Sequence, residues 1–470
     1  MRKQIIIFLF LLAISGSLNA QSIFQNGRII VSKNGHYLQF ENGKPFFWLG
    51  DTAWELFHRL KLEEIIQYLD NRQKKGMNVI QAVALAEFNG LRQPNQYGEV
   101  PLIDLNPETP NDNYFKLIDT VVKLAAKRNM FIGLLPTWGD KVTAKWGEGP
   151  AVFNPQNAYK YGLWIGKRYK NSKNLLWILG GDRPARRDTS DWTTIWREMA
   201  KGISEGTGNK AFITYHPQGG DPSTSQLIHN EGWLDMNMMQ SGHGGGHDVP
   251  VWNTILRDYN IKPAKPTLDA EPNYEDHPVN PWPKWDPANG YYRDYDVRKQ
   301  IYRSVFSGAA GVTYGHHSVW QFYNPREEKI NFADRHWTEA IDRPGAFQSG
   351  YLKKLIESRP QLNRIPDQSI IVKGQGEKGE HICATRDEAG TYAMIYIPVG
   401  KMITLNLSSF KTNKIKAYWF NPRTGMALPK GLVEIADKTE VSFTSPEQGV
   451  EKDWVLILDD ARKGYKVPEM

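Results

Sequence analysis

The sequence predicts an α/β fold, a (β/α)8 barrel, followed by a small all-β sandwich domain. Three observations support this prediction: eight short apolar runs, stretches of helical periodicity between them, and a change to short strands and turns from about residue 362. Eight strand–helix units in about 320 residues fit a closed barrel. The alternative is an open doubly wound sheet, but no Gly-x-Gly-x-x-Gly motif follows the first run.

The barrel strands are expected in continuous apolar runs, because strands buried on both faces carry few polar side chains. These runs cover residues 46–49, 78–83, 131–135, 175–179, 211–215, 236–240, 267–270 and 311–314. Helices are expected between and after them, at 62–75, 112–128, 157–170, 191–205, 249–259, 294–306 and 345–358. Asp112, Asp191 and Asp294 stand where helix N-caps or first-turn acids are favoured.

Both flanks of the barrel are expected to be β structure. Asn34-Gly35 and Asn42-Gly43 bracket an alternating segment, which predicts a short hairpin region. Beyond Pro360, short strands separated by turns are expected at 392–397, 403–407, 416–420 and 454–458. The predicted domains are therefore the barrel with its N-terminal hairpin at 21–360 and the sandwich at 361–470.

The first 20 residues have the pattern of a signal peptide. Arg2 and Lys3 give a positive start, residues 5–14 form an apolar run, and Ala20 ends a small-residue cleavage site. The apolar run is short for a transmembrane helix, so no membrane attachment is expected after cleavage. A single cysteine, Cys383, leaves no internal disulfide. We therefore predict a secreted protein of the bacterial periplasm.

Composition narrows the classes of function. The 58 Lys and Arg residues against 51 Asp and Glu give a net charge of +7, and no run of five basic residues occurs. Nucleic-acid binding is therefore not expected. Apolar and charged contents of 40% and 23% exclude a disordered or fibrous chain. Aromatic residues make up 12% of the chain, and their flat faces either fill the core or stack on sugar rings.

Chemically active residue types follow nearly every predicted strand, at the end of the barrel where (β/α)8 enzymes bind substrate. Asp182 follows the fourth strand and Glu271 the seventh, on facing sides of the ring. Hydrolysis of a glycosidic bond requires a carboxylic acid and a second carboxylate. The sequence therefore favours a glycosidase with Asp182 and Glu271 as the catalytic pair. The alternatives are an ion pair of Asp182 with Arg183 and a competing role for Asp269.

Other residues after the strands have the side chains that sugar subsites use. We expect hydroxyl groups to be bound by Asp51, Glu87, His216, Gln240, His243 and His316, and sugar rings to stack on Trp54, Trp138 and Trp320. His243 and His247 have the spacing of a zinc site on a helix, but the three glycines between them disfavour a helix. Neither a metal nor a cofactor is therefore expected.

Three motifs resemble the apiosidase-like (β/α)8 glycoside hydrolases of family 140. They are Phe-Trp-Leu-Gly-Asp-Thr-Ala-Trp at 47–54, Gly-Gly-Asp-Arg-Pro at 180–184 and Asp-Ala-Glu-Pro at 269–272. The segment at 418–425 resembles the β-sandwich of collagen-binding type that follows the barrel in that family. The resemblance covers roughly residues 28–360 and the C-terminal part.

This resemblance implies an Asp acid/base and a Glu nucleophile, matching Asp182 and Glu271, and a retaining mechanism. It also implies release of apiose-linked side-chain fragments from the plant pectin rhamnogalacturonan II. The wider clan of retaining barrel glycosidases usually has Asn-Glu after the fourth strand, and Gly181-Asp182 departs from that pattern. A glycosidase of other sugar specificity and a non-catalytic carbohydrate-binding or adhesion protein are the alternatives.

Overall fold

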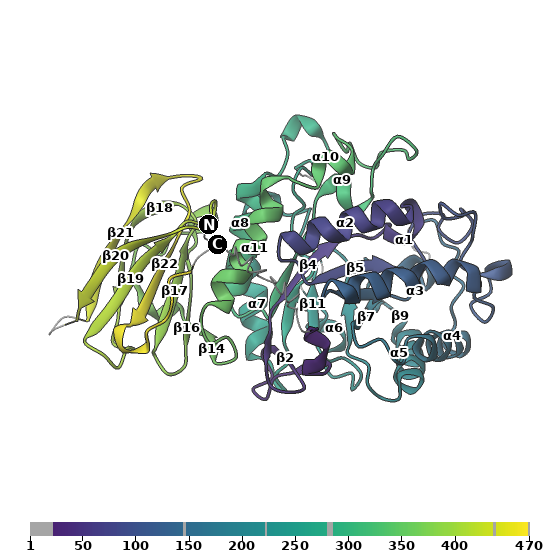
Figure 1. Cartoon of the computed structure of the whole chain (residues 1–470), viewed down its shortest axis with the longest axis horizontal. Helices are drawn as coiled ribbons and strands as arrows, with labels where there is room; N and C mark the ends of the chain where they lie inside the picture. The colour runs from purple at the N-terminus through teal and green to yellow at the C-terminus, as the bar shows by residue number, and fades with distance from the viewer. Residues whose placement is uncertain (1–21, 144–146, 221–222, 280–284, 436–438, 469–470) are drawn as a thin grey trace, which may run out of the picture.

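The computed structural model of the chain has a strand–helix barrel on one side and an all-β unit on the other (Figure 1). It describes residues 22–143, 147–220, 223–279, 285–435 and 439–468. The predicted signal peptide at 1–20 lies outside the described residues. In the part of the chain that is described, no helix is long and apolar enough to cross a lipid bilayer.

Eight parallel strands form the barrel, which confirms the predicted fold class. They are β4 (Trp48–Thr52), β5 (Val79–Val83), β6 (Phe131–Leu135), β7 (Leu175–Gly180), β10 (Ile213–His216), β11 (Asn237–Met239), β12 (Thr267–Asp269) and β13 (Gly311–Tyr314). Their order in the sheet is β10-β7-β6-β5-β4-β13-β12-β11. A parallel bridge between Thr214 and Met236 brings the two end strands together, so the sheet is nearly closed.

Side chains of each strand alternate between the barrel interior and the surrounding helices. Trp48 and Val79 belong to the cluster that fills the interior, as do Phe131, Ile178, Met238 and Leu268. Leu49, the neighbour of Trp48, belongs instead to the cluster formed with the outer helices. The interior is therefore a packed core, and a cavity can open only beyond the ends of the strands.

Seven longer helices surround the barrel strands, close to the predicted positions. They are α2 (Leu62–Lys74), α3 (Asp112–Lys127), α4 (Pro155–Arg168), α5 (Thr193–Thr207), α7 (Val251–Asn260), α8 (Asp294–Phe306) and α11 (Pro344–Glu357). Short helices are α1 (Leu56–Arg59), α6 (Ser225–Ile228), α9 (His317–Trp320) and α10 (Trp337–Ala340). Asn111 and Asn154 accept backbone hydrogen bonds at the starts of α3 and α4, so these side chains define where both helices begin.

The N-terminal hairpin region is a three-stranded antiparallel sheet. It comprises β1 (Ile29–Val31), β2 (Leu38–Phe40) and β3 (Pro45–Phe46). Phe40 and Phe46 pack on Phe131, the first residue of β6. This sheet therefore covers the amino ends of the barrel strands and leaves the carboxyl ends open.

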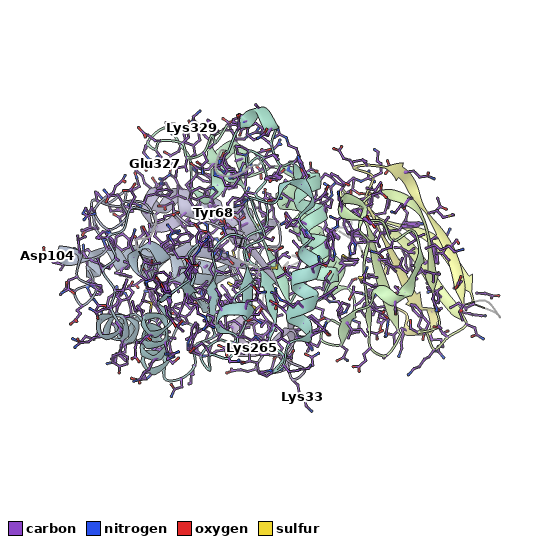
Figure 2. All side chains as sticks on the ribbon, turned by 180° about the vertical axis from the view of Figure 1, so that it is seen from behind. Lys33, Tyr68, Asp104, Lys265, Glu327 and Lys329 are labelled. Carbon is purple, nitrogen blue, oxygen red and sulfur yellow. The ribbon has the colours of Figure 1, made fainter. Side chains whose placement is uncertain are left out.

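Surface and interior are clearly divided in the barrel. Lys33, Asp104 and Lys329 project from its periphery, whereas Tyr68 of α2 lies inside (Figure 2).

A two-stranded hairpin, β8 (Arg186–Arg187) and β9 (Ser190–Asp191), interrupts the connection from β7 to α5. This hairpin follows Asp182 directly and lies at the open end of the barrel.

The C-terminal part consists of two antiparallel sheets, as predicted. A six-stranded sheet contains β14 (Arg364–Pro366), β16 (Cys383–Asp387), β17 (Tyr392–Ile397), β22 (Trp454–Asp460), β19 (Lys414–Phe420) and β20 (Ala427–Glu434) in that order. A three-stranded sheet contains β15 (Ile371–Lys373), β18 (Gly400–Asn406) and β21 (Glu440–Gly449). Their facing sides enclose a separate apolar cluster that includes Ile395, Leu405 and Trp419.

The barrel and the sandwich meet in one continuous hydrophobic cluster. Helices α8 and α11 lie between the two parts (Figure 1). Val297 and Tyr302 of α8 share this cluster with Tyr396 and Val455 of the sandwich. The rings of Tyr302 and Tyr396 stack with centroids 4.8 Å apart. The sandwich is thus packed on the barrel by apolar surface.

Two buried ion pairs fix this interface. The guanidinium of Arg298 on α8 donates to both carboxylate oxygens of Asp453, each at 3.0 Å. Arg359, just after α11, binds both oxygens of Asp459 at 2.9 and 2.6 Å. Bidentate pairs of this kind set a single relative orientation of the groups that make them.

Candidate active site

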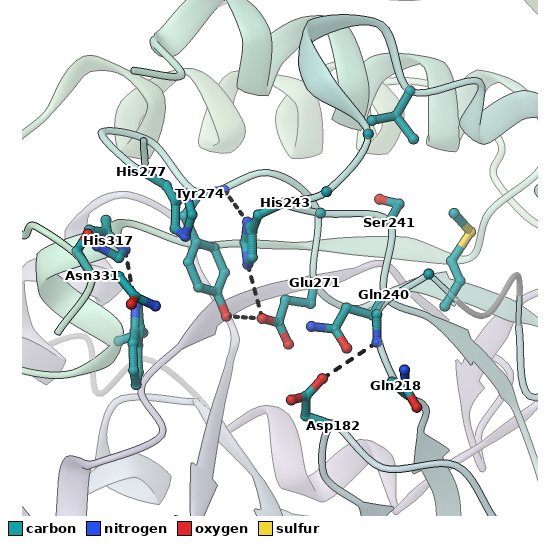
Figure 3. A pocket seen from close by; sticks show the side chains of 18 of the residues that line it. Asp182, Gln218, Gln240, Ser241, His243, Glu271, Tyr274, His277, His317 and Asn331 are labelled. Atoms are coloured by element: carbon teal, nitrogen blue, oxygen red, sulfur yellow. Dashed lines mark hydrogen bonds and ion pairs between the residues drawn. The ribbon is translucent and has the colours of Figure 1, made fainter. Parts of the chain in front are cut away.

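A cavity of about 1110 Å³ opens at the carboxyl ends of the barrel strands. Its lining brings together segments that follow β4, β5, β6, β7, β10, β11, β12 and β13. Both predicted catalytic residues, Asp182 and Glu271, line it (Figure 3). Trp54, Trp138, Trp320, Glu87, Gln240 and His243 also line it, as expected from the sequence.

Glu271 is the most tightly held carboxylate in the cavity. The hydroxyl of Tyr274 donates to its Oε1 at 2.6 Å, and His243 Nε2 lies 3.2 Å from the same oxygen. His216 Nε2 lies 3.0 Å from Oε2. Trp54 Nε1 donates to the Tyr274 hydroxyl at 3.2 Å. The Tyr274 hydroxyl oxygen therefore accepts from Trp54 and points its own proton to Glu271.

The hydrogen bonds of His243 define which ring nitrogen carries the proton. The backbone N–H of Tyr274 donates to His243 Nδ1 at 3.2 Å, so Nδ1 is an acceptor. The proton of the neutral ring is therefore on Nε2, which faces Glu271. Burial raises the pKa of Glu271, but the contacts with His216 and His243 outweigh burial and lower it to about 2. Glu271 is thus an ionised carboxylate at neutral pH.

The backbone at and before Asp182 has an unusual conformation that places the Asp182 side chain at the cavity. Gly180, Gly181 and Asp182 all have positive φ, at 83°, 106° and 51°. Gly181 has no room for a side chain, because an added Cβ would lie 2.8 Å from the Trp138 ring. The three left-handed residues turn the chain sharply after β7 and bring the short Asp182 side chain over the cavity.

The surroundings of Asp182 favour its protonated form. Burial raises its pKa and the charge of Glu271 raises it further, while Arg183 Nη1, 3.0 Å from Asp182 Oδ2, only partly offsets these effects. Gly219 N–H donates to Oδ1 at 3.4 Å. One cavity therefore holds two carboxyl groups whose pKa values are shifted in opposite directions, which is typical of an acid and a nucleophile acting together.

Glu87 is a third carboxyl group in the cavity wall. Arg183 Nη2 lies 3.6 Å from its Oε1, so Arg183 stands between Glu87 and Asp182. Burial, with a contribution from the charge of Asp182, raises the pKa of Glu87 to about 8. A protonated Glu87 can donate a hydrogen bond to a sugar hydroxyl, in agreement with the predicted binding role.

The cavity wall also contains a row of rings, in which Tyr274 and His277 were not predicted from the sequence. His243 and His277 stack with centroids 4.5 Å apart, and His317 meets His277 edge-on at 4.4 Å. Tyr274, His277 and His317 all line the cavity. Burial lowers the pKa of His277 well below its ordinary value and that of His317 to about 3, so both rings are neutral. The dense cluster Asn-Tyr-Glu-Asp-His at 273–277, which follows Glu271 after one proline, was the available signal.

The expectation that Asp51 binds sugar is wrong. β4 continues to Thr52, so Asp51 lies inside the strand and its side chain faces the helices rather than the cavity. Asp51 is fully buried, with its Oδ2 2.7 Å from Arg72 Nε and bonded to the Tyr68 hydroxyl. Asp51 is therefore part of the contact between β4 and α2.

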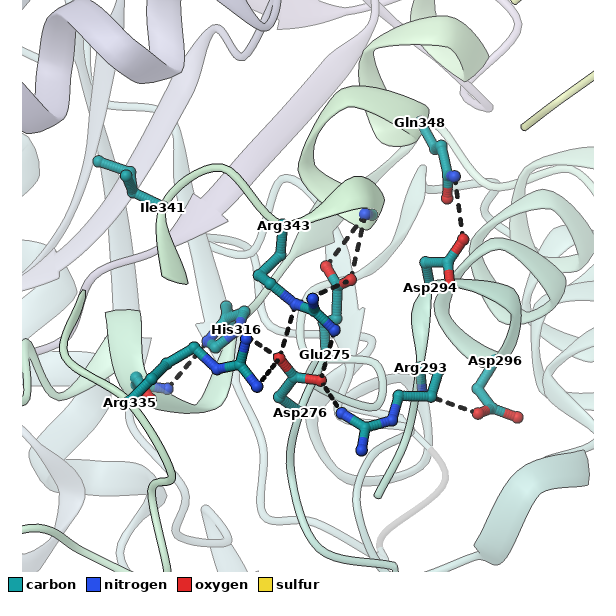
Figure 4. A network of polar contacts seen from close by, with 12 residues as sticks. Glu275, Asp276, Arg293, Asp294, Asp296, His316, Arg335, Ile341, Arg343 and Gln348 are labelled. Atoms are coloured by element: carbon teal, nitrogen blue, oxygen red, sulfur yellow. Dashed lines mark hydrogen bonds and ion pairs between the residues drawn. The ribbon is translucent and has the colours of Figure 1, made fainter. Parts of the chain in front are cut away.

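The expectation that His316 binds sugar is also wrong. His316 lies outside the cavity, and its neighbour His317 lines the cavity instead. His316 is fully buried, with Nε2 3.2 Å from Asp276 Oδ2 (Figure 4). Arg293, Arg335 and Arg343 converge on the same Asp276 carboxylate. This network anchors the segment that carries Tyr274 and His277, so His316 supports the cavity wall without lining it.

His216 and Asp269 lie behind the cavity wall and do not line the cavity. His216 contacts Glu271 but does not itself line the cavity, so it holds the carboxylate and is not a direct sugar ligand. Asp269 accepts hydrogen bonds from Ser241 and from Ser304 of α8, at 2.7 Å each. Asp269 therefore faces the helix layer and does not compete with Glu271.

The two histidines with zinc-like spacing have different partners. His243 turns to Glu271, whereas His247 Nδ1 lies 2.8 Å from Asp296 Oδ1. Among the described residues, no group of three His, Cys, Asp or Glu side chains is arranged to hold a metal ion.

Two sequence models of protein families match this chain. Residues 32–363 match "Apiosidase-like, catalytic domain", and residues 365–459 match "Putative collagen-binding domain of a collagenase". Both matches agree with the resemblance inferred from the motifs. No curated protein matches the sequence.

Solved structures of glycoside hydrolases share the whole architecture. The crystal structure of a glycoside hydrolase family 5 from Bacteroides vulgatus is 32% identical with a TM-score of 0.86, covering 95% of this chain and 96% of that chain. A second structure, described as a glycoside hydrolase, is 33% identical with a TM-score of 0.85, covering 94% of this chain and 99% of that chain. The similarity thus extends over both the barrel and the sandwich.

Proposed function

This chain belongs to the apiosidase-like family of glycosidases, and we propose that it removes apiose-linked side chains from the plant pectin rhamnogalacturonan II by a retaining mechanism. The observation that carries the proposal is the pair of carboxyl groups in one cavity, Asp182 with a raised pKa and Glu271 with a lowered one. The family adds the class of substrate.

In the first step, the protonated Asp182 carboxyl gives its proton to the glycosidic oxygen while the bond from that oxygen to the anomeric carbon breaks. The Glu271 carboxylate bonds to the anomeric carbon from the opposite face, which gives a glycosyl ester. In the second step, Asp182 takes a proton from water, the water oxygen attacks the anomeric carbon, and Glu271 leaves as a carboxylate. Two inversions give net retention. Retaining glycosidases in general hold their two carboxyl groups about 5–5.5 Å apart, whereas inverting ones hold them about 6.5–9.5 Å apart.

Other cavity residues have roles that follow from their chemistry. Trp54, Trp138 and Trp320 line the cavity and are the candidates for stacking on a sugar ring. Gln240 and Glu87 offer polar atoms for hydroxyl groups. Tyr274, His243 and His216 hold the nucleophile.

The proposal includes export to the bacterial periplasm, on the basis of the signal-peptide pattern at 1–20. The mature protein is then expected to begin at Gln21. N-terminal sequencing of the protein recovered from the periplasm tests this, and an intact Met1 in the recovered protein would contradict it.

A product assay tests the activity. The protein is incubated with rhamnogalacturonan II, homogalacturonan and arabinogalactan, and released fragments are identified by chromatography and mass spectrometry. Asp182→Asn and Glu271→Gln are the matched variants; Asn suits position 182 because it tolerates a positive φ. Both are expected to lower turnover by at least about a hundredfold without unfolding the protein.

Asp269→Asn is the control, because Asp269 is a buried carboxyl group two residues before Glu271 that does not line the cavity. It is expected to keep turnover close to that of the wild type. Apiose-terminated fragments from rhamnogalacturonan II alone support the full proposal. Product from another glycan only would refute the substrate, and binding of glycans without product would favour the carbohydrate-binding alternative. The anomeric form of the first product, read by NMR, tests retention.

A further inference from the structure

We propose that the C-terminal sandwich is a positioning element of the active site. In this proposal its loop at residues 377–381, the sandwich loop, holds the pocket loop at residues 242–251 in place through the stack of His381 on Trp252. The proposal goes beyond the proposed function, because it assigns an intramolecular role to a domain of collagen-binding type. It relies on the proposed function only for its kinetic test.

The sandwich loop makes an aromatic stack with the first turn of α7, which follows the pocket loop. The rings of Trp252 and His381 are nearly parallel, at 8°, with centroids 3.9 Å apart. The side chain of Trp252 is almost fully buried. Helix α7 begins directly where the pocket loop ends, so this stack fixes that end of the loop.

Arg303 of α8 locks the sandwich loop against this stack. Its guanidinium carbon lies 5.1 Å from the centre of the Trp252 ring. The same guanidinium donates to three backbone carbonyl oxygens of the sandwich loop, those of Lys378, Gly379 and His381, at 2.8–3.1 Å. The sandwich loop is therefore held by its backbone, and His381 is presented to Trp252 in one position.

Asp248 makes a second contact between the loops. Lys299 Nζ of α8 donates to Asp248 Oδ1 at 2.5 Å. A Cβ added at Gly379 would lie 2.9 Å from this oxygen, so the sandwich backbone lies directly against the Asp248 carboxylate. The pocket loop is thus enclosed between α8 and the sandwich.

The pocket loop carries a residue that holds the nucleophile. His243 lies near its start and donates to Glu271, while Val249 and Val251 near its end line the cavity. Gly244, Gly245 and Gly246 separate the two parts and give the loop little stiffness of its own. Its geometry therefore depends on external supports. They include barrel contacts and the sandwich contacts. On the barrel side, Tyr292 donates to the His243 carbonyl at 2.9 Å, Asn273 donates to the Gly246 carbonyl at 3.1 Å, and His247 Nδ1 lies 2.8 Å from Asp296 Oδ1.

Three full-length variants test the proposal. His381→Ala removes the stack, and His381→Phe restores a flat ring. Burial lowers the pKa of His381 to about 4, so the native ring is neutral. The neutral ring of Phe is therefore a suitable replacement. Asp459→Asn is the control, because it breaks the buried pair with Arg359 at the same domain interface but away from the pocket loop. Thermal unfolding ranks the loss of stability in all three.

Hydrogen–deuterium exchange of the peptide covering 242–252 is measured first, because it needs no substrate. Exchange is expected to rise at least about tenfold in His381→Ala, and to stay near the wild-type rate in His381→Phe and Asp459→Asn. Unchanged exchange in His381→Ala, or an equal rise in Asp459→Asn, would overturn the proposal whether or not the glycan substrate is correct.

Kinetics with the cleaved glycan separate positioning from stability. His381→Ala is expected to lower kcat/KM about tenfold or more, since small displacements of catalytic groups are costly. Its acid limb should move to higher pH, because Glu271, faced by His216, His243, Tyr274 and Asp182, loses part of its support from His243. A wild-type kcat/KM with an unshifted acid limb in His381→Ala would overturn the positioning role.

Discussion

Tyr274→Phe removes the shortest hydrogen bond to the proposed nucleophile and leaves the ring in place. The Tyr274 hydroxyl donates to Glu271 Oε1 at 2.6 Å. A hydrogen bond to a charged group contributes about 1.5–3 kcal/mol, and one pKa unit corresponds to about 1.4 kcal/mol. Loss of this bond is therefore expected to raise the pKa of Glu271 by about one to two units from its value of about 2.

The sign of the pH effect follows from the role of the ionised form. A nucleophile must be a carboxylate, so a higher pKa means that activity is lost at a higher pH as the solution is made more acidic. At pH 3 the wild type should keep about nine-tenths of its kcat/KM, while the variant should keep about half or less. The assay is the pH dependence of kcat/KM on released oligosaccharide, with folding checked by circular dichroism at each pH.

Tyr314→Phe is the matched control. The Tyr314 hydroxyl donates to Glu275 Oε2, also at 2.6 Å and also buried, but Glu275 lies outside the cavity. This variant is expected to lose stability without moving the acid limb. An acid limb in Tyr274→Phe that superimposes on that of the wild type would refute the reasoning that Tyr274 keeps Glu271 ionised.

Two further predictions concern residues that the sequence predicts as ligands of sugar hydroxyl groups. Asp51→Ala should destabilise the protein by about 3–5 kcal/mol, because it leaves the Arg72 charge buried and unpaired; urea unfolding measures this, and a loss below about 1 kcal/mol would contradict the pairing. Gln240→Ala should raise KM about fivefold with little change in kcat, because Gln240 lines the cavity and offers one neutral hydrogen bond; an unchanged KM would exclude it from substrate binding.

Much of the fold could be predicted because the barrel strands are continuous apolar runs. β6 and β13 are predicted with their observed bounds. Pro136 and Gly315 mark their carboxyl ends. The end of β4 was harder. Trp48 and Leu49 are apolar but Gly50, Asp51 and Thr52 are not, so the run ends before the strand does, and Asp51 is expected after the strand instead of within it.

Local pattern also places only part of the site. Asp182 and Glu271 follow strands of an obvious type, and both line the cavity. The choice between His316 and His317 depends on a backbone turn at the start of α9, which no local pattern records. Contacts between distant segments, such as Gly219 N–H with Asp182 Oδ1, are set by packing and have no sequence signature.

The apolar cluster shared by α8 and the sandwich bears on how the chain can be divided. A domain that is freely exchanged between proteins needs a sealed polar surface of its own. Here Tyr396, Val455 and Ile457 of the sandwich pack against apolar residues of the barrel. Asp453 of the sandwich is paired with the guanidinium of Arg298 on the barrel helix α8. A sandwich separated from the barrel would place these groups in water. The boundary near residue 364 therefore separates a barrel from a sandwich. It does not separate two units that fold independently.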